Sequence, residues 1–202
     1  SGPSEGRQME RVPIYLSTWE QWSHLFPETL VTAGIGEPKD GHGSDAYPGI
    51  VSHEKGLSGT LGEIDARLPY AELVLGAYTD DAANAFQLSA LPSDSTVLNS
   101  HVGDDNIVVF YQPKSWLATS YFSTLNGDTL QFETRDGDIM DLQSESKWNF
   151  FGECISGKME GERLKFVRST VMEWHLWPEH FPETELVSDV RDGALQADLV
   201  AS

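Results

Sequence analysis

Residues 120–142 read SYFSTLNGDTLQFETRDGDIMDL, and two tight-turn signals stand within this run of short apolar segments. Asn126-Gly127 and Asp136-Gly137 are dipeptides that accept the positive φ angles of a two-residue hairpin turn. Around each dipeptide, apolar and polar side chains alternate, as they do in half-buried strands. The stretch therefore predicts two consecutive antiparallel hairpins.

The same pattern continues in both directions along the chain. Upstream, TVLNSHVGDDNIVVFYQP (96–113) predicts two strands about a turn at residues 103–105, and a further strand is expected at about 72–78. Downstream, KWNFFGECISG (147–157) begins a last hairpin. Many short strands joined by tight turns predict a mainly β (α+β) fold, an antiparallel sandwich or a partly open barrel of hairpins.

Strand alternation in KWNFFGECISG would place Trp148, Phe150 and Gly152 on one face, with Asn149 and Phe151 on the other. Because aromatic side chains stand on both faces, this strand is predicted to be central in its sheet and covered on both sides. Gly152 would then mark a bulge or a close approach of another side chain.

A second signal is a phrase that occurs twice, W-x-x-W-x-x-x-F-P-E-T, at residues 19–29 and 174–184. Tryptophans three positions apart share one helical face, and the residue before a proline is disfavoured in a helix. Each copy predicts a short Trp-rich helix near one end of the chain. Pro27 ends the first helix. The second helix is predicted over RSTVMEWHLWPEHF (168–181), interrupted at Pro178 and ended by Pro182.

Two interpretations of these tryptophans stay open. They are buried anchors of the core, or the two helices face each other and line an aromatic pocket. The second interpretation makes candidate ligand-binding residues of Trp19, Trp22, Trp174 and Trp177.

Composition excludes several classes of partner. The 202 residues carry a formal net charge of -19, which repels nucleic acid phosphates, and no apolar run is long enough to span a membrane. Cys154 is the single cysteine, so neither an intrachain disulfide nor a thiolate zinc cluster is expected. A small molecule or a protein remains as the expected partner.

The chain is predicted to be organised as one domain over residues 12–190, beginning with a short strand at VPIYL (12–16). Polar residues 1–11 are expected to be disordered, and residues 191–202 to form an acidic tail. A Gly-rich stretch at 34–62 predicts a long loop. Residues 1–11 lack the apolar core of a signal peptide; an extracytoplasmic location with the signal removed is favoured over a cytoplasmic one.

Polar candidates for a site are few. Asp65 and Arg67 in DARLP are expected to form an ion pair that is either structural or faces a substrate, and Asp141 with Trp148 would complete a polar pocket. The histidines show no ligand-spaced pair, although packing of the two helices would let His24, His175 and His180 converge. Neither a metal nor a cofactor is expected.

Four stretches carry a family resemblance: DARLPYAELVLGAYTDDAANAFQLSAL (65–91), VLNSHVGDDNIVVFYQP (97–113), DLQSESKWNFFGECISGKMEGERLKFV (141–167) and WHLWPEHFPET (174–184). Together they resemble a prokaryotic family, the domain of unknown function 3179 (DUF3179). The resemblance spans about residues 65–187 and implies one domain but no activity.

This sequence departs from the family pattern at two points. Many relatives carry a Cys-Pro-x-Cys pair just after the apolar strand, whereas here the strand ends FYQPKSW with Pro113 and no cysteine. Phe181 stands where relatives have a histidine before the final proline. Any thiol or metal chemistry of those relatives therefore does not transfer to this chain.

Two functional hypotheses follow. The first is a non-catalytic binding or scaffold domain that uses an aromatic-lined cleft. The second is an enzyme of unassigned class with a polar pocket around Asp65, Arg67, Asp141 and Trp148. An enzyme should bring two or more ionisable groups into one concave site, which a scaffold need not do.

Overall fold

The computed structural model is mainly β, with several mostly antiparallel sheets, two short α-helices and no closed barrel among the described residues. The predicted disordered start (1–11) and Gly-rich loop (34–62) lie outside those residues. The structure describes residues 12–31, 65–94, 96–113 and 115–188, with the backbone of 190–191 and 194–195.

The first sheet has four strands in the order β12-β1-β2-β13. Its two central strands form an antiparallel hairpin, while β12 pairs antiparallel with β1 and β13 pairs parallel with β2. Two segments nearly a hundred residues apart in the chain thus build one sheet. The strands are β1 (Leu73–Tyr78), β2 (Ala83–Gln87), β12 (Arg168–Glu173) and β13 (Glu185–Val187).

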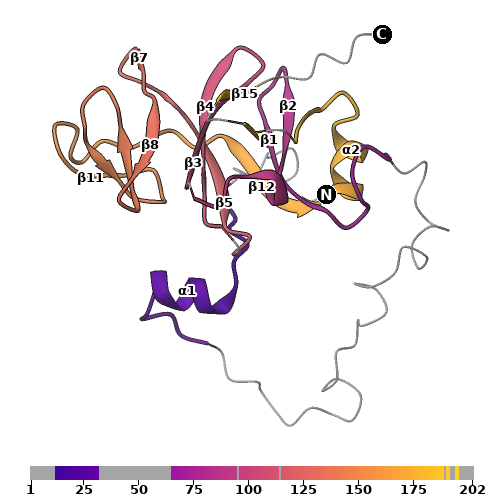
Figure 1. Ribbon diagram of the computed structural model, residues 1–202, viewed down its shortest axis with the longest axis horizontal. Helices are drawn as coiled ribbons and strands as arrows, with labels where there is room; N and C mark the ends of the chain where they lie inside the picture. The colour runs from indigo at the N-terminus through magenta and orange to yellow at the C-terminus, as the bar shows by residue number, and fades with distance from the viewer. Residues whose placement is uncertain are drawn as a thin grey trace, which may run out of the picture.

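Short helical segments flank this sheet. A 3-10 turn, η1 (Leu88–Ala90), follows β2, and η2 (Trp174–Leu176) leads from β12 into α2 (Trp177–His180). The remaining helix, α1 (Trp19–Leu25), lies below the sheets in the view of Figure 1 and well apart from α2.

Hairpins build the rest of the molecule. The middle sheet, β3-β4-β5, is antiparallel, and another four-stranded sheet has the order β11-β10-β9-β8 (Figure 1). The strands are β3 (Val97–Val102), β4 (Asp105–Tyr111), β5 (Ala118–Phe122), β6 (Thr124–Leu125), β7 (Asp128–Thr129), β8 (Phe132–Arg135), β9 (Asp138–Asp141), β10 (Lys147–Trp148), β11 (Cys154–Ser156), β14 (Val190–Arg191) and β15 (Ala194–Leu195).

The predicted turns at Asn126-Gly127 and Asp136-Gly137 are confirmed. All four residues have positive φ, at 53° and 93° in the first pair and 53° and 86° in the second. These values are those of two-residue hairpin turns, so the dipeptides set the register of β6–β7 and β8–β9.

Three local predictions are wrong. Residues 12–16 form no strand, and residues 168–173 are strand β12, not helix, because they pair with β1 along its whole length. At Asn149 the chain leaves strand β10, because its side-chain Oδ1 accepts hydrogen bonds from two backbone N–H groups at 2.9 and 3.0 Å and closes a turn. Where the predicted tail begins, residues 190–191 and 194–195 pair as β14 and β15.

The buried apolar residues fall into three clusters. One lies around the β8–β11 sheet with Trp148 and Phe110, and another between the first and middle sheets with Phe86 and Val109. The third joins α2 to the outer face of β1 and β2 and is centred on Trp177. Each cluster depends on residues from distant parts of the chain, so the sheets support one another.

Candidate functional site

The loop between β4 and β5 holds an aromatic side chain in an unusual backbone conformation. The Leu117 carbonyl accepts a hydrogen bond from the Gln112 N–H at 2.8 Å, which closes the loop at its base. Within the loop, Trp116 has φ 59° and keeps 51% of its surface exposed. A bulky residue in the left-handed region is strained, and such strain is concentrated at binding and catalytic sites.

Trp116 borders a cleft of about 450 Å³ between this loop, η1 and the start of β1. The volume lies within the range of small-molecule sites. The wall of the cleft is mostly apolar and combines two aromatic rings with aliphatic side chains. These residues are Leu73, Leu88, Leu91, Tyr111, Trp116 and Leu117.

One carboxylate is fixed at the edge of the same cleft. Glu72 Oε1 accepts a hydrogen bond from Ser89 Oγ at 2.5 Å, and Ser89 Oγ in turn accepts one from Gln87 Nε2 at 2.9 Å. The Tyr111 hydroxyl is turned toward the Pro92 carbonyl, to which it donates at 3.0 Å. Among the lining residues that the structure describes, Glu72 is the only one that is charged at neutral pH.

No motif in the sequence identified this cleft in advance. The available signal was the departure at FYQPKSW, because the family's Cys-Pro-x-Cys pair would fall at Gln112 and Ser115. Gln112 lines the Trp116 cleft, whereas Ser115 lines a separate cavity beside α1. In this chain the two positions therefore carry an amide and a hydroxyl, with Pro113 between them.

Four of the predicted site residues gather around the second copy of the repeated phrase. Asp65 and Arg67 form an ion pair at 2.8 Å that is partly exposed. The Arg67 guanidinium lies 5.1 Å from the ring centroid of Trp174, and the Trp174 indole N–H donates to the Asp65 carbonyl at 3.0 Å. Hydrogen bonds from Arg67 outweigh desolvation and lower the pKa of Asp65. Together with Trp177, these residues anchor α2.

Both copies of the phrase fold in the same way. In each, the second tryptophan donates its indole N–H to the threonine seven residues later, at 3.1 Å for Trp22 to Thr29 and 2.8 Å for Trp177 to Thr184. The same tryptophan ring packs on the phenylalanine four residues later, with centroid separations of 4.6 and 4.4 Å. The helices end before Pro27 and Pro182, as predicted.

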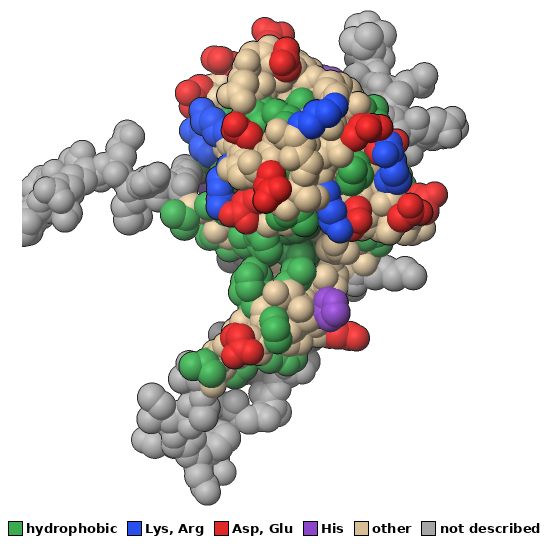
Figure 2. Space-filling model, turned by 90° about the vertical axis from the view of Figure 1, so that its left-hand side faces the viewer, with side chains coloured by type: hydrophobic (Ala, Val, Ile, Leu, Met, Phe, Trp, Pro, Cys, Tyr) green, Lys and Arg blue, Asp and Glu red, His purple; other side chains and the backbone are tan. Residues whose placement is uncertain are grey.

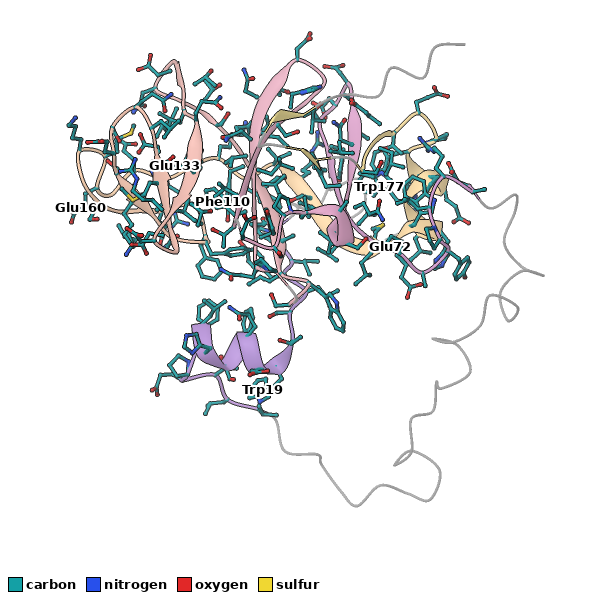
Figure 3. The ribbon with its side chains drawn as sticks, in the orientation of Figure 1. Trp19, Glu72, Phe110, Glu133, Glu160 and Trp177 are labelled. Carbon is teal, nitrogen blue, oxygen red and sulfur yellow. The ribbon has the colours of Figure 1, made fainter. Side chains whose placement is uncertain are left out.

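The two copies differ in burial. Trp174 and Trp177 are 0% and 1% exposed, so the core interpretation is confirmed for the second copy. Trp19 is 57% exposed and lies on α1 below the sheets, whereas Trp177 lies between α2 and the strands (Figure 3). Because α1 and α2 are far apart, the helices form no shared pocket, and His24 does not meet the histidines of the second copy.

Asp141 and Trp148 lie in the β8–β11 sheet, away from Asp65 and Arg67. Asp141 is fully buried, and its oxygens accept hydrogen bonds from the Ser144 N–H at 2.6 Å and from the Trp148 indole at 3.0 Å. Burial raises the pKa of Asp141, but these hydrogen bonds, with that from the Ser144 hydroxyl, outweigh it and leave the pKa lowered. This pair therefore organises the turn after β9.

Other polar groups offer little chemistry in the part of the chain that the structure describes. Burial raises the pKa of the Cys154 thiol, which has its sulfur 3.4 Å from the Ser156 carbonyl. No three histidine, cysteine or carboxylate side chains gather as metal ligands there. Within the same residues, no helix has the length and apolar character needed to cross a bilayer.

A family model described as "Protein of unknown function (DUF3179)" matches residues 1–184. The chain belongs to the DUF3179 family. The match extends upstream of the 65–187 region that carries the resemblance and includes both copies of the repeated phrase. No curated protein and no solved structure matches this DUF3179 chain.

Proposed function

We propose that this DUF3179 protein is a non-catalytic binding domain whose ligand site is the Trp116 cleft. The observation that carries the proposal is Trp116 itself, an exposed indole held at positive φ over an apolar cleft. An exposed tryptophan in a strained loop contributes little to folding. A binding role accounts for both its exposure and its strain.

The wall of the cleft indicates the class of ligand. Leucine and aromatic side chains favour a flat apolar group, which would be removed from water between Trp116 and the aliphatic wall. The Glu72 carboxylate at the edge favours a positive charge, and indole faces also attract cations. A compact aromatic ammonium compound, or the equivalent end of a larger molecule, fits both features.

Catalysis is less well supported. General acid–base chemistry needs at least two positioned ionisable groups, and the described lining of the cleft offers one carboxylate. The alternative pocket around Asp65, Arg67, Asp141 and Trp148 would need residues that lie apart: the first two precede β1, and the other two belong to β9 and β10. In addition, the Asp141 carboxylate already accepts several internal hydrogen bonds.

The test is a titration of the ¹⁵N-labelled full chain with phenethylammonium, followed by amide chemical shifts. Its neutral isostere, 2-phenylethanol, is titrated in parallel. Trp116→Ala removes the indole, and Glu72→Gln removes the charge without changing shape. Leu142→Ala is the matched control, because Leu142 is 49% exposed and lies in the loop after β9, away from the cleft.

We expect shifts confined to residues 71–73, 88–93 and 111–118, with a dissociation constant on the order of 1 mM for so small a probe. Trp116→Ala should weaken binding of both probes about tenfold or more, and Glu72→Gln should remove the preference for the ammonium compound. Leu142→Ala should bind as the parent does. Shifts scattered over the surface, or equal binding by Trp116→Ala, would reject the cleft as the site.

A further inference from the structure

The N-terminal segment, defined as residues 12–31, is the source of a second inference, independent of the cleft. The two copies of the repeated phrase are offset by 155 positions, since 174 minus 19 is 155. With this offset, residues 12–31 correspond to residues 167–186. The helices of both copies share the same internal hydrogen bond and ring packing. The contacts of the second copy with the sheet therefore indicate which contacts the first copy can make.

In the second copy, the unit encloses a hairpin. Strand β12, just before the helix, pairs with the outer edge of β1, and strand β13, just after it, pairs with the outer edge of β2. Helix α2 covers the face of the same hairpin, where the Trp177 ring fills the space over Gly76. The phrase and its flanks therefore form a strand–helix–strand clasp around β1 and β2.

In the first copy, no described strand pairs with either arm, although Tyr15 and Phe26 pack on Phe151 of the same chain at ring-centroid distances of 5.5 and 5.2 Å. The offset places residues 13–18 at the position of β12 and residues 30–31 at the start of β13, yet neither range forms a strand. The β1–β2 hairpin is not available to these residues, because β12 and β13 close both of its edges. The described residues therefore offer no strand partner for the two arms of the first copy.

Apolar side chains of the first copy are exposed where their counterparts are buried. Val12 is 67% exposed and Trp19 57%, whereas Val167 and Trp174 are both 0% exposed. Figure 2 shows hydrophobic side chains running down the connection from the body to this segment. Six of the ten large hydrophobic residues that are exposed in the described structure fall within it, namely Val12, Ile14, Leu16, Trp19, Leu30 and Val31.

We propose that residues 12–31 are a docking segment that clasps an antiparallel β-hairpin of a second, sequence-related domain. The partner hairpin has two open edges, to which residues 13–18 and 30–31 add as outer strands. It carries a glycine facing Trp22, as Gly76 faces Trp177, because any side chain there would collide with the indole. An arginine before the hairpin stacks on Trp19, as Arg67 does on Trp174.

The test supplies such a hairpin at high local concentration. Residues 65–91, which contain Arg67 and the β1–β2 hairpin, are fused through a flexible Gly/Ser linker of about 20 residues to the N-terminus of the full chain. Hydrogen exchange of residues 12–18 and 30–31 is then measured. The matched control carries Gly76→Val in the added hairpin only, which leaves the body of the protein unchanged.

We expect amide exchange in both ranges to slow at least tenfold in the fusion and to remain at the level of the unfused chain in the Gly76→Val control. A fusion in which Trp19→Ser is also introduced should lose most of the protection, since the exposed Trp19 is not needed for folding. Unchanged exchange in residues 12–31 would overturn the proposal. Equal protection by the Gly76→Val hairpin would overturn it as well.

Discussion

The indole of Trp177 lies against the backbone of Gly76, so close that a methyl group added at Gly76 would come within 2.2 Å of the ring. Gly76 stands in the middle of β1, where glycine ordinarily weakens a strand. Here the missing side chain makes room for a tryptophan that is itself held by Thr184. The contact fixes α2 on the sheet.

Gly76→Ala is therefore expected to destabilise the protein by about 3 kcal/mol through overpacking. Urea unfolding at neutral pH measures the change. In a Trp177→Leu background, which removes the colliding ring, the same substitution should cost less than about 1 kcal/mol. An equal cost in both backgrounds would mean that the indole is not what excludes the methyl group.

Trp148→Ala should lower the free energy of unfolding by about 3–5 kcal/mol, because the side chain is 2% exposed in a well-packed cluster. Thermal melts followed by circular dichroism provide the measurement. Trp148→Phe keeps most of the packing but withdraws the indole N–H from Asp141, and it should cost about 1–3 kcal/mol. A parent-like melt for Trp148→Ala would contradict a structural role.

The free energy of unfolding should differ between the parent and Asp141→Asn by an amount that depends on pH. The folded-state pKa of Asp141 lies below its unfolded value of about 3.9, so the ionised group stabilises the fold above that pH. The stabilisation is lost as the pH falls through the folded-state pKa. At pH 7 the variant should be about 2 kcal/mol less stable, and the gap should narrow below about pH 4. Urea unfolding at several pH values tests this, and a gap independent of pH would refute it.

Trp116→Gly should leave the protein as stable as the parent, or about 1 kcal/mol more stable, because glycine accepts the positive φ without strain. Binding of phenethylammonium should nevertheless be lost. Differential scanning calorimetry and the amide titration report the two properties separately. A loss of stability above about 1 kcal/mol would show that the indole supports the fold instead.

Tight turns and helix ends could be predicted from the sequence because their causes are local. The turn at Asn126-Gly127 forms because both residues readily adopt positive φ, independently of the rest of the fold. In the same way, Pro27 ends α1 through its local effect on the preceding residue. Residues 168–173 were predicted to be helical from the tryptophans that follow, yet they form β12 because β1 offers an edge. That edge comes from a segment nearly a hundred residues away, which no local pattern reveals.

The candidate site was less accessible to prediction for a related reason. The cleft combines Leu73, η1 and Trp116, which are separated in the chain and carry no recognisable motif. The positive φ of Trp116 is a property of the folded loop and is not encoded by a glycine. Conversely, Asp65 and Asp141 suggested a shared polar pocket, but Asp65 lies in the segment before β1 and contacts Trp174, whereas Asp141 ends β9 and contacts Trp148.

The pairing of β1 with β12 also sets an order for folding. Hairpins such as β8–β9 close a loop of only a few residues. The first sheet must instead bring residues 73–87 to residues 168–187, which costs more conformational entropy. We therefore expect the hairpins to form before the first sheet is complete. During synthesis, the β1–β2 hairpin leaves the ribosome with both edges unpaired until β12 and β13 follow. Truncation or slow translation before residue 168 would therefore leave an aggregation-prone hairpin, with Gly76 uncovered.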